Sequence, residues 1–216
     1  MFQYIAANPG YILEKAWEHF YLFIISWAIA VVVGIAIGIF VTRPGRKRIG
    51  QAILSVMGAA QSVPSIAIIA LVFILLGIGG TPAIVALFLY SLVPIIFNSA
   101  SGLLSVDPAM LEAARGMGMT KRQILFKIEM PVSIAPIASG MRSAATINIG
   151  TATIASAIGA GGLGEMIFIG LRLMNNNMIL TGALFSALIA IIVDTVLAGV
   201  ESSVTSEGMK LRENYF

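Results

Sequence analysis

Two long apolar stretches without a charged side chain dominate the hydropathy pattern, residues 20–42 and residues 49–106. A helix needs about 20 apolar residues to cross the hydrocarbon of a bilayer. The first stretch therefore predicts one membrane-spanning helix, whereas the second is too long for a single crossing. Residues 77–82, which are rich in glycine and contain a proline, supply the break that divides it in two.

The complete pattern predicts an all-α integral membrane protein with one transmembrane domain over residues 1–216. Its five spans are expected at about residues 20–42, 50–76, 83–104, 131–158 and 178–200. The fourth is rich in Ser, Thr, Ala and Gly, small residues that allow transmembrane helices to approach closely. We therefore expect the fourth span to be buried among the others.

The amino-acid composition excludes several classes of protein. Hydrophobic residues make up 58% of the 216 residues and charged residues only 11%, whereas soluble domains carry roughly 25% charged residues. This excludes a disordered chain and argues against a soluble enzyme. The chain has no cysteine and a single histidine, His19, so we expect no metal site built on cysteine or histidine clusters and no His pair for catalysis.

The positions of lysine and arginine predict the orientation. An odd number of spans places the termini on opposite sides of the membrane. If residues 43–48, residues 107–129 and the tail after Glu201 share one side, ten Lys and Arg residues lie there, against Lys15 and Arg172 opposite. Because basic residues accumulate in cytoplasmic loops, the N-terminus is expected outside and the C-terminus in the cytoplasm.

The charged segment over residues 107–130 separates the third and fourth spans and predicts two short helices. Asp107 followed by Pro108 is typical of a helix start, and Gly116 and Gly118 would end that helix. Thr120 with Gln123 fits a capping box that opens a second helix over residues 121–129, expected to stop before the proline at position 131.

The same segment carries a spaced motif. Glu112, Ala113 and Ala114 are followed after three residues by Gly118, and after nine more by Ile-Glu-Met-Pro at 128–131. This resembles the EAA motif of ABC importer permeases, in which leucine occupies the position of Met130. The resemblance implies a type I importer fold, with a cytoplasmic coupling helix between the third and fourth spans that docks on a separate ATPase. The residues it implicates in coupling are Glu112, Ala113, Ala114, Arg115, Gly118, Ile128 and Pro131.

The resemblance also implies partners. The chain contains no G-x-x-x-x-G-K-[ST] phosphate-binding loop, so it is expected not to be an enzyme, and ATP and Mg would be bound by a cytoplasmic ABC ATPase dimer. A second permease copy or a paralogue, an extracytoplasmic solute-binding protein and membrane lipid are the other implied partners, with no nucleic acid. The implied location is the inner (cell) membrane of a bacterium or archaeon.

Two further segments bear on the substrate. Residues 61–65 and the glycine-rich residues 158–165 resemble permeases for glycine betaine, carnitine and choline, which are osmoprotectants. Methionine importer permeases share the glycine-rich segment, so methionine or another small solute remains an alternative. Residues 159–164 also match G-x-G-x-x-G, but a dinucleotide site requires a preceding strand and a βαβ unit. An exofacial turn or re-entrant segment is expected instead.

Four residues inside predicted spans are candidates for lining the translocation path: Pro64, Asn98, Arg142 and Asn148. The prolines of the spans could instead only shape the bundle, and the asparagines could form interhelical hydrogen bonds. Arg142 and Asp194 are ionisable residues within spans, where charge is costly, and the sequence leaves open whether they pair. An ion-coupled secondary transporter using these two residues is the rival hypothesis, although five unequal spans show no inverted repeat.

Overall fold

The computed structural model describes residues 1–204, which form helices and turns without a strand. The helices in chain order are α1 (Phe2–Ala7), α2 (Pro9–Thr42), α3 (Lys47–Ala60), α4 (Ser65–Leu76), α5 (Gly80–Leu104), α6 (Pro108–Gly116), α7 (Lys121–Ile124), α8 (Met130–Val132), α9 (Ile134–Ala155), α10 (Leu163–Arg172) and α11 (Asn176–Val204). A π-helical turn, Leu125–Glu129, joins α7 to α8, and a 3-10 turn, Ser156–Ile158, follows α9. Of the basic residues assigned above to the cytoplasmic side, Lys210 and Arg212 lie outside the described residues.

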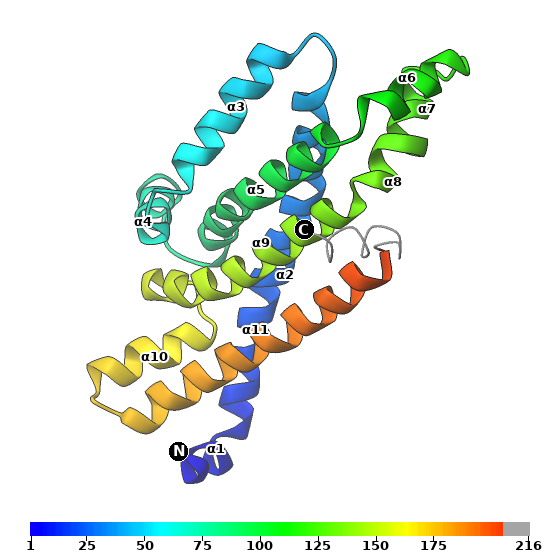
Figure 1. Ribbon diagram of the computed structural model, residues 1–216. Helices are drawn as coiled ribbons and strands as arrows, with labels where there is room; N and C mark the ends of the chain where they lie inside the picture. Colours follow the sequence, from blue (N-terminus) through cyan, green and yellow to red (C-terminus); the bar gives the residue numbers. More distant parts are fainter. Residues whose placement is uncertain (205–216) are drawn as a thin grey trace.

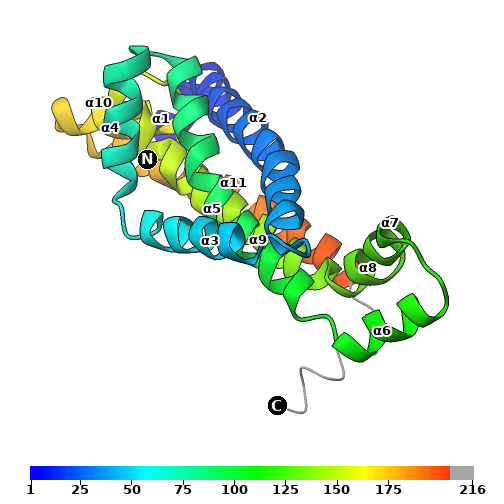
Figure 2. The ribbon, with the colours of Figure 1, turned by 90° about the horizontal axis from the view of Figure 1, so that it is seen from above.

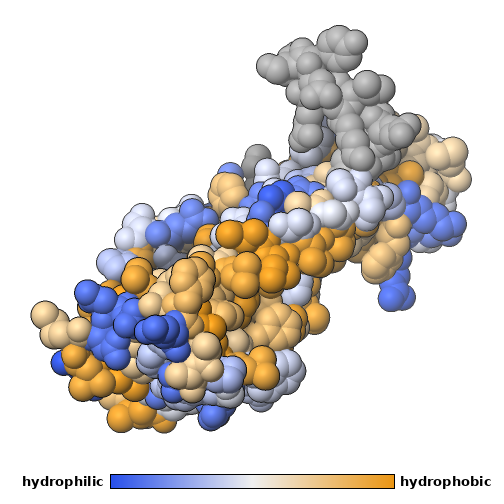
Figure 3. Space-filling view, turned by 90° about the horizontal axis from the view of Figure 1, so that it is seen from below, coloured by the Kyte–Doolittle hydropathy of each residue, from blue (hydrophilic) through white to orange (hydrophobic). Residues whose placement is uncertain are grey.

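Three helices, α2, α5 and α11, are each long and apolar enough to cross a membrane. Two bent pairs add to them: α3 with α4, and the continuous run 121–132 with α9. Counting each pair as one span gives up to five crossings, the number that the sequence pattern predicts. Figure 3 shows a band of hydrophobic residues across one face, with hydrophilic residues at its ends and along one edge. A broad hydrophobic band is expected for a protein embedded in lipid.

The first spanning helix starts at Pro9, well before the predicted start at residue 20. Pro9 occupies the first turn, where its missing N–H costs nothing. With 34 residues, α2 is roughly 51 Å long at about 1.5 Å per residue, more than the hydrocarbon thickness. Its early turns pack against α10, where Ile12 contacts the buried Leu163 and Met166, so tertiary packing extends the helix beyond the apolar run.

The second predicted span, residues 50–76, does not form as one continuous helix. The chain forms α3 and α4 instead, and the two are bent by 101°. Pro64 has an extended ψ of 134° at the N-cap of α4, because it cannot donate a helical hydrogen bond and it disfavours helical geometry at Val63. The break therefore lies at residues 61–64. Figure 2 shows α3 and α4 running in different directions.

The bundle centre is formed by α2, α5 and α9, and α9 also packs against α11 and α10 (Figure 1). Small residues make these contacts close. A Cβ on Gly38 of α2 would lie 2.6 Å from the Ser99 Cβ of α5, and one on Gly140 of α9 would lie 2.6 Å from the Asn98 Cβ. The expectation that the fourth span is buried among other helices is confirmed, because its small residues face α5 and α2.

The glycine-rich segment forms a turn between Ser156–Ile158 and α10, with no strand before it. Gly162, at φ +80°, donates its N–H to Glu18 of α2 over 2.8 Å. Lys15 bridges Glu18 at 3.0 Å and Glu165 at 2.9 Å. The turn is thus tied to the first turns of α2 rather than shaped for a nucleotide. In Figure 1, α10 and the start of α11 lie at the same end of the molecule as α1.

Candidate functional site

The segment from α6 to α8 projects from the bundle at one end (Figures 1 and 2). Its first helix starts as predicted, because the Asp107 carboxylate accepts the N–H of Ala109 at 2.8 Å and Pro108 takes the first helical position. The capping box is also confirmed. The Thr120 hydroxyl accepts the N–H of Gln123 at 3.3 Å, and the Gln123 side chain accepts the N–H of Thr120 at 2.8 Å.

The turn between the two helices depends on Gly118. The α6 helix ends at Gly116, and Gly118 follows at φ +77°, a left-handed conformation that glycine adopts without steric cost. The N–H of Met119 then bonds to the carbonyl of Ala114 at 3.1 Å, which closes the helix end. Both glycines therefore end the helix as expected, and Gly118 sets the angle between α6 and α7.

The seven residues implicated in coupling differ in exposure. Ala114 is buried and Ile128 half-buried, so these two hold the segment together, whereas the others are exposed: Glu112, Ala113, Arg115, Gly118 and Pro131. Next to them, Met110 is 42% and Met117 72% exposed. Small, charged and apolar side chains are thus exposed together on this segment. This mixture is typical of a surface that docks on another protein.

The predicted end of the second helix before Pro131 is wrong. The chain continues helically through the π turn Leu125–Glu129 into α8, and stops at Ser133. Proline lacks the N–H for a regular α-helical bond, and here it follows a turn whose hydrogen-bond spacing is already wider. The run 121–132 and α9 then meet at 64°. Residues 121–132, called the lever below, therefore form one continuous helical run that meets the fourth span, α9, at Ser133.

The base of this lever is tied to the first span. Arg43, which caps the end of α2, donates to the carboxylate of Glu129 at 2.6 Å, and its Nε donates to the carbonyl of Ile39 at 3.1 Å. The Glu129 side chain is only 13% exposed. A charge-assisted pair of this kind is stronger than a neutral hydrogen bond. Residue 129 of the motif thus connects the lever to α2 as well as to α9.

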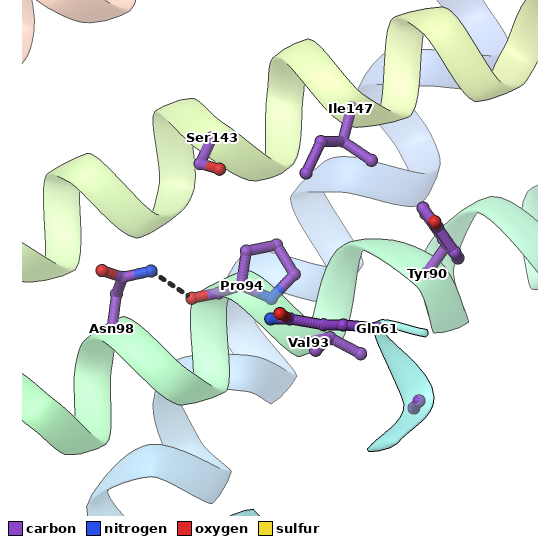
Figure 4. Close-up of a pocket in the computed structure, with 8 residues that line it drawn as sticks. Gln61, Tyr90, Val93, Pro94, Asn98, Ser143 and Ile147 are labelled. Atoms are coloured by element: carbon purple, nitrogen blue, oxygen red, sulfur yellow. Dashed lines mark hydrogen bonds between the residues drawn. The ribbon is translucent and has the colours of Figure 1, made fainter. Parts of the chain in front are cut away.

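A polar pocket of about 300 Å³ lies in the membrane-spanning part, between α5, α9 and the α3–α4 break. Figure 4 shows Tyr90, Pro94 and Asn98 on α5, Ser143 and Ile147 on α9, and Gln61 from the break, around the same space. The α5 residues are spaced by four and share one helix face. The Asn98 amide donates to the carbonyl of Pro94 at 2.9 Å, which keeps its side chain along that face.

Of the four candidate path residues, Asn98 alone is among the residues that line this pocket. Pro64 is exposed at the start of α4 and acts on the pocket only by creating the break. Asn148 is fully buried between α2, α5 and α9. Its amide donates to the hydroxyls of Ser26 at 2.9 Å and Ser91 at 2.7 Å, so the structure places it in the packed interior, where it joins three helices.

We expect Asn148→Ala to lower stability without changing solute affinity. Ser26 and Ser91 keep their own bonds to carbonyls one turn earlier. The variant therefore loses the two bonds to these hydroxyls and a longer one, of 3.5 Å, to the carbonyl of Leu87, and leaves no new unpaired donor. The expected loss is about 1–2 kcal/mol, measured as a lower midpoint of thermal unfolding in detergent. Asn98→Ala is the contrasting variant, since it should change transport kinetics with little effect on that midpoint. An Asn148→Ala protein of native stability would contradict this role.

Arg142 turns toward α11. Its Nε and Nη2 donate to the two carboxylate oxygens of Asp194 at 2.7 and 2.8 Å, and Nη1 donates to Glu201 at 3.3 Å. The structure therefore answers the question of pairing that the sequence leaves open. A bidentate pair satisfies both charges within the spans and fastens α9 to α11. Arg142 is not among the residues lining the polar pocket.

Sequence reasoning missed Gln61, Tyr90 and Ser143, the other polar residues of the pocket. The signal for Tyr90 was its spacing of four and eight residues from Pro94 and Asn98, which places all three on one face of a helix. Nothing local to residues 61 and 143 indicates that they face the same space. Within residues 1–204, no group of three or more His, Cys, Asp or Glu side chains is arranged to hold a metal ion.

Comparison with known families decides the identity of the fold. The family described as binding-protein-dependent transport system inner membrane component matches residues 34–206. The chain belongs to this family. It is an ABC transporter permease, a transport subunit and not an enzyme, and the type I importer fold expected from the EAA motif is confirmed.

The permease is similar along almost its whole length to characterised transport proteins. It is 40% identical over 210 residues to the glycine betaine/carnitine/choline transport system permease protein OpuCB of Bacillus subtilis (strain 168), covering 97% of this chain and 96% of that one. It is 43% identical over 181 residues to the osmoprotectant import permease protein OsmY of Salmonella typhimurium, covering 84% and 77%.

The fold of the permease matches a solved transporter. A chain of the MetNI methionine ABC transporter superposes with a TM-score of 0.81, covering 92% of the permease and 99% of that chain, at 22% sequence identity. At this identity the match concerns the fold alone. The permease is therefore an inner membrane component with the helical arrangement of a type I importer.

Proposed function

We propose that this permease, paired with a second copy or a paralogue, forms the membrane path of an ATP-driven importer for a quaternary ammonium osmoprotectant such as glycine betaine, carnitine or choline. The projecting segment from α6 to α8 carries the proposal, because most of its EAA-motif residues are exposed around the turn at Gly118. The names of the relatives at 37–43% identity support the substrate class.

The proposed coupling runs from the segment into the bundle. An ABC ATPase dimer, which binds ATP and Mg, would bind to the exposed side chains of α6. A shift of α6 would act through the turn at Gly118 on the helical run 121–132 and then on α9 across the 64° bend. Because α9 provides one wall of the polar pocket, moving it changes the width of the path. In this proposal the whole chain acts as one transmembrane domain.

The proposed orientation follows from the same segment. If the ATPases are cytoplasmic, α6 and the C-terminus face the cytoplasm, and the N-terminus lies outside. The glycine-rich turn, held to α2 by Lys15, Glu18 and Glu165, then lies on the outer side. An extracytoplasmic solute-binding protein would deliver the solute at that end.

The chemistry of the pocket suits a solute that carries a quaternary ammonium group, which has no N–H to donate. Tyr90 offers an aromatic ring, and aromatic faces attract quaternary ammonium groups. Gln61, Asn98 and Ser143 add neutral polar groups, and none of the lining residues is charged. Weak, neutral contacts of this kind allow a solute to enter and also to leave. A pocket of about 300 Å³ is at the small end of ligand sites, as a small osmolyte requires.

Uptake by the reconstituted complex tests this function. Proteoliposomes containing the permease, its ATPase and its binding protein should accumulate labelled betaine, carnitine or choline only with ATP inside. Tyr90→Leu is expected to raise the half-saturation concentration by roughly two- to thirtyfold, the value of one cation–π contact of about 0.5–2 kcal/mol. Tyr90→Phe, which keeps the ring, should remain near wild type.

The rival functions make different predictions in the same assay. Preferential uptake of methionine would replace the osmoprotectant assignment. Uptake that continues without the ATPase and collapses when a protonophore removes the proton gradient would support an ion-coupled secondary transporter. The pairing of Arg142 with Asp194 speaks against that alternative, because both charges are already satisfied by each other.

A further inference from the structure

A second pocket, of about 310 Å³, lies where the loop after α2 meets the base of the projecting segment. Five basic residues line it: Arg43, Arg46, Arg115, Lys121 and Arg122. Glu129 is its one acidic residue. Two of the arginines come from the loop that follows α2, and the other three basic residues from α6 and α7, so the fold gathers charges that lie some 70 residues apart in the sequence.

Most of this charge is uncompensated. Arg43 is paired with Glu129 at 2.6 Å. Arg46 lies with its guanidinium carbon 3.9 Å from the centre of the Phe40 ring, which holds the side chain without neutralising it. Arg115, Lys121 and Arg122 have no ion-pair partner among residues 1–204. Like charges this close repel each other, so the pocket favours an anion.

An apolar pocket of about 320 Å³ adjoins the basic one and shares Arg43 and Pro44 with it. Val41, Leu54 and Leu104 line the apolar part. The two pockets meet where α2 ends at Thr42 and α5 ends at Leu104, which is where the apolar spans give way to charged residues. A basic and an apolar pocket thus adjoin at the ends of two spanning helices.

We propose that the paired pockets bind an anionic phospholipid of the inner leaflet, with its phosphate in the basic pocket and an acyl chain in the apolar one. Arginine forks match phosphate oxygens and can bind them bidentately. Clustered basic residues at the cytoplasmic surface attract anionic headgroups. A free anion would use only the basic half, whereas a lipid uses both. The assignment of the lipid to the inner leaflet depends on the proposed orientation of the chain, whereas the lipid binding itself does not.

Native mass spectrometry of the full-length chain, purified in detergent and mixed with phosphatidylglycerol or phosphatidylcholine, tests the site. The wild-type chain should retain phosphatidylglycerol over phosphatidylcholine. The double variant Arg46→Gln/Arg122→Gln should reduce phosphatidylglycerol retention roughly tenfold, since it removes two cations near the headgroup. Thermal unfolding of both proteins checks that the variant is folded.

The matched control is Arg48→Gln/Lys127→Gln. It removes two exposed basic residues, one from the start of α3 and one from the projecting segment, neither of which lines the pocket, and should bind phosphatidylglycerol as the wild type does. Equal retention of the two lipids, or an unchanged double variant, would overturn the proposal. So would complete displacement of the lipid by millimolar inorganic phosphate. None of these measurements requires transport. The lipid-binding proposal can therefore be overturned while the proposed importer function still holds.

Discussion

Gly118→Val is expected to abolish solute uptake and solute-stimulated ATP hydrolysis while leaving membrane insertion intact. Gly118 holds φ at +77°, a conformation that costs a β-branched residue about 1–3 kcal/mol or drives the backbone elsewhere. Either outcome changes the angle between α6 and α7. A tenfold loss corresponds to only about 1.4 kcal/mol, so we expect coupling to fall at least tenfold in reconstituted proteoliposomes.

The matched control substitutes the same position with a residue that tolerates the left-handed backbone conformation. Gly118→Asn also adds a side chain, and a Cβ at this position meets no atom within 4 Å, but asparagine tolerates the left-handed region. It should retain most of the activity. If Gly118→Val transported at the wild-type rate, the turn would not transmit the ATPase movement, and the assignment of α6 as the coupling helix would be wrong. Equal loss in both variants would instead point to the added side chain.

Gly164→Ala is expected to disrupt the packing of α10 on the end of α9. A Cβ at Gly164 would overlap the backbone carbonyl of Thr153 and lie 2.6 Å from the Ser156 hydroxyl oxygen. The obstructing atoms include backbone, which cannot rotate away as a side chain can, so α10 must shift. We expect a destabilisation of about 3 kcal/mol or more, seen as a lower thermal unfolding midpoint and reduced yield of folded protein in detergent.

Gly199→Ala is the control for this substitution. Gly199 lies within α11, and a Cβ there meets no atom within 4 Å. Because alanine favours a helix over glycine by up to about 1 kcal/mol, this change should leave stability equal or slightly higher. Opposite signs for the same chemical change would separate close packing from helix propensity. A Gly164→Ala protein as stable as the wild type would mean that α10 does not pack as described.

Gly118 lies in the segment that leads into one end of α9, and Gly164 packs against the other end. One end of α9 continues from the coupling lever at Ser133, and the other leads into the glycine-rich turn that Glu18 holds to α2. Between them, Ser143 and Ile147 line the polar pocket. In the proposed mechanism, a displacement of residues 121–132 would reach the pocket through this one helix.

The sequence by itself determined the features that depend on neighbouring residues. The apolar runs predicted a membrane protein with five spans, and the structure has up to five. The caps at Asp107 and Thr120 and the turn at Gly118 lie where the residue types require them. Each depends on backbone hydrogen bonds or a backbone angle within a few residues, so the local sequence is sufficient. The EAA spacing likewise identified the family.

Only the tertiary structure decided which distant side chains meet. Whether Arg142 reaches Asp194 depends on how far α9 is displaced along α11, and the pocket around Asn98 requires the rotation of α5 and α9 together with the 101° bend of α3 and α4. These offsets result from close contacts such as Gly38 with Ser99. One hydrophobic pattern allows two helices to pack at several positions along each other. The local sequence therefore specifies where the helices form but not how far each is displaced along its neighbour.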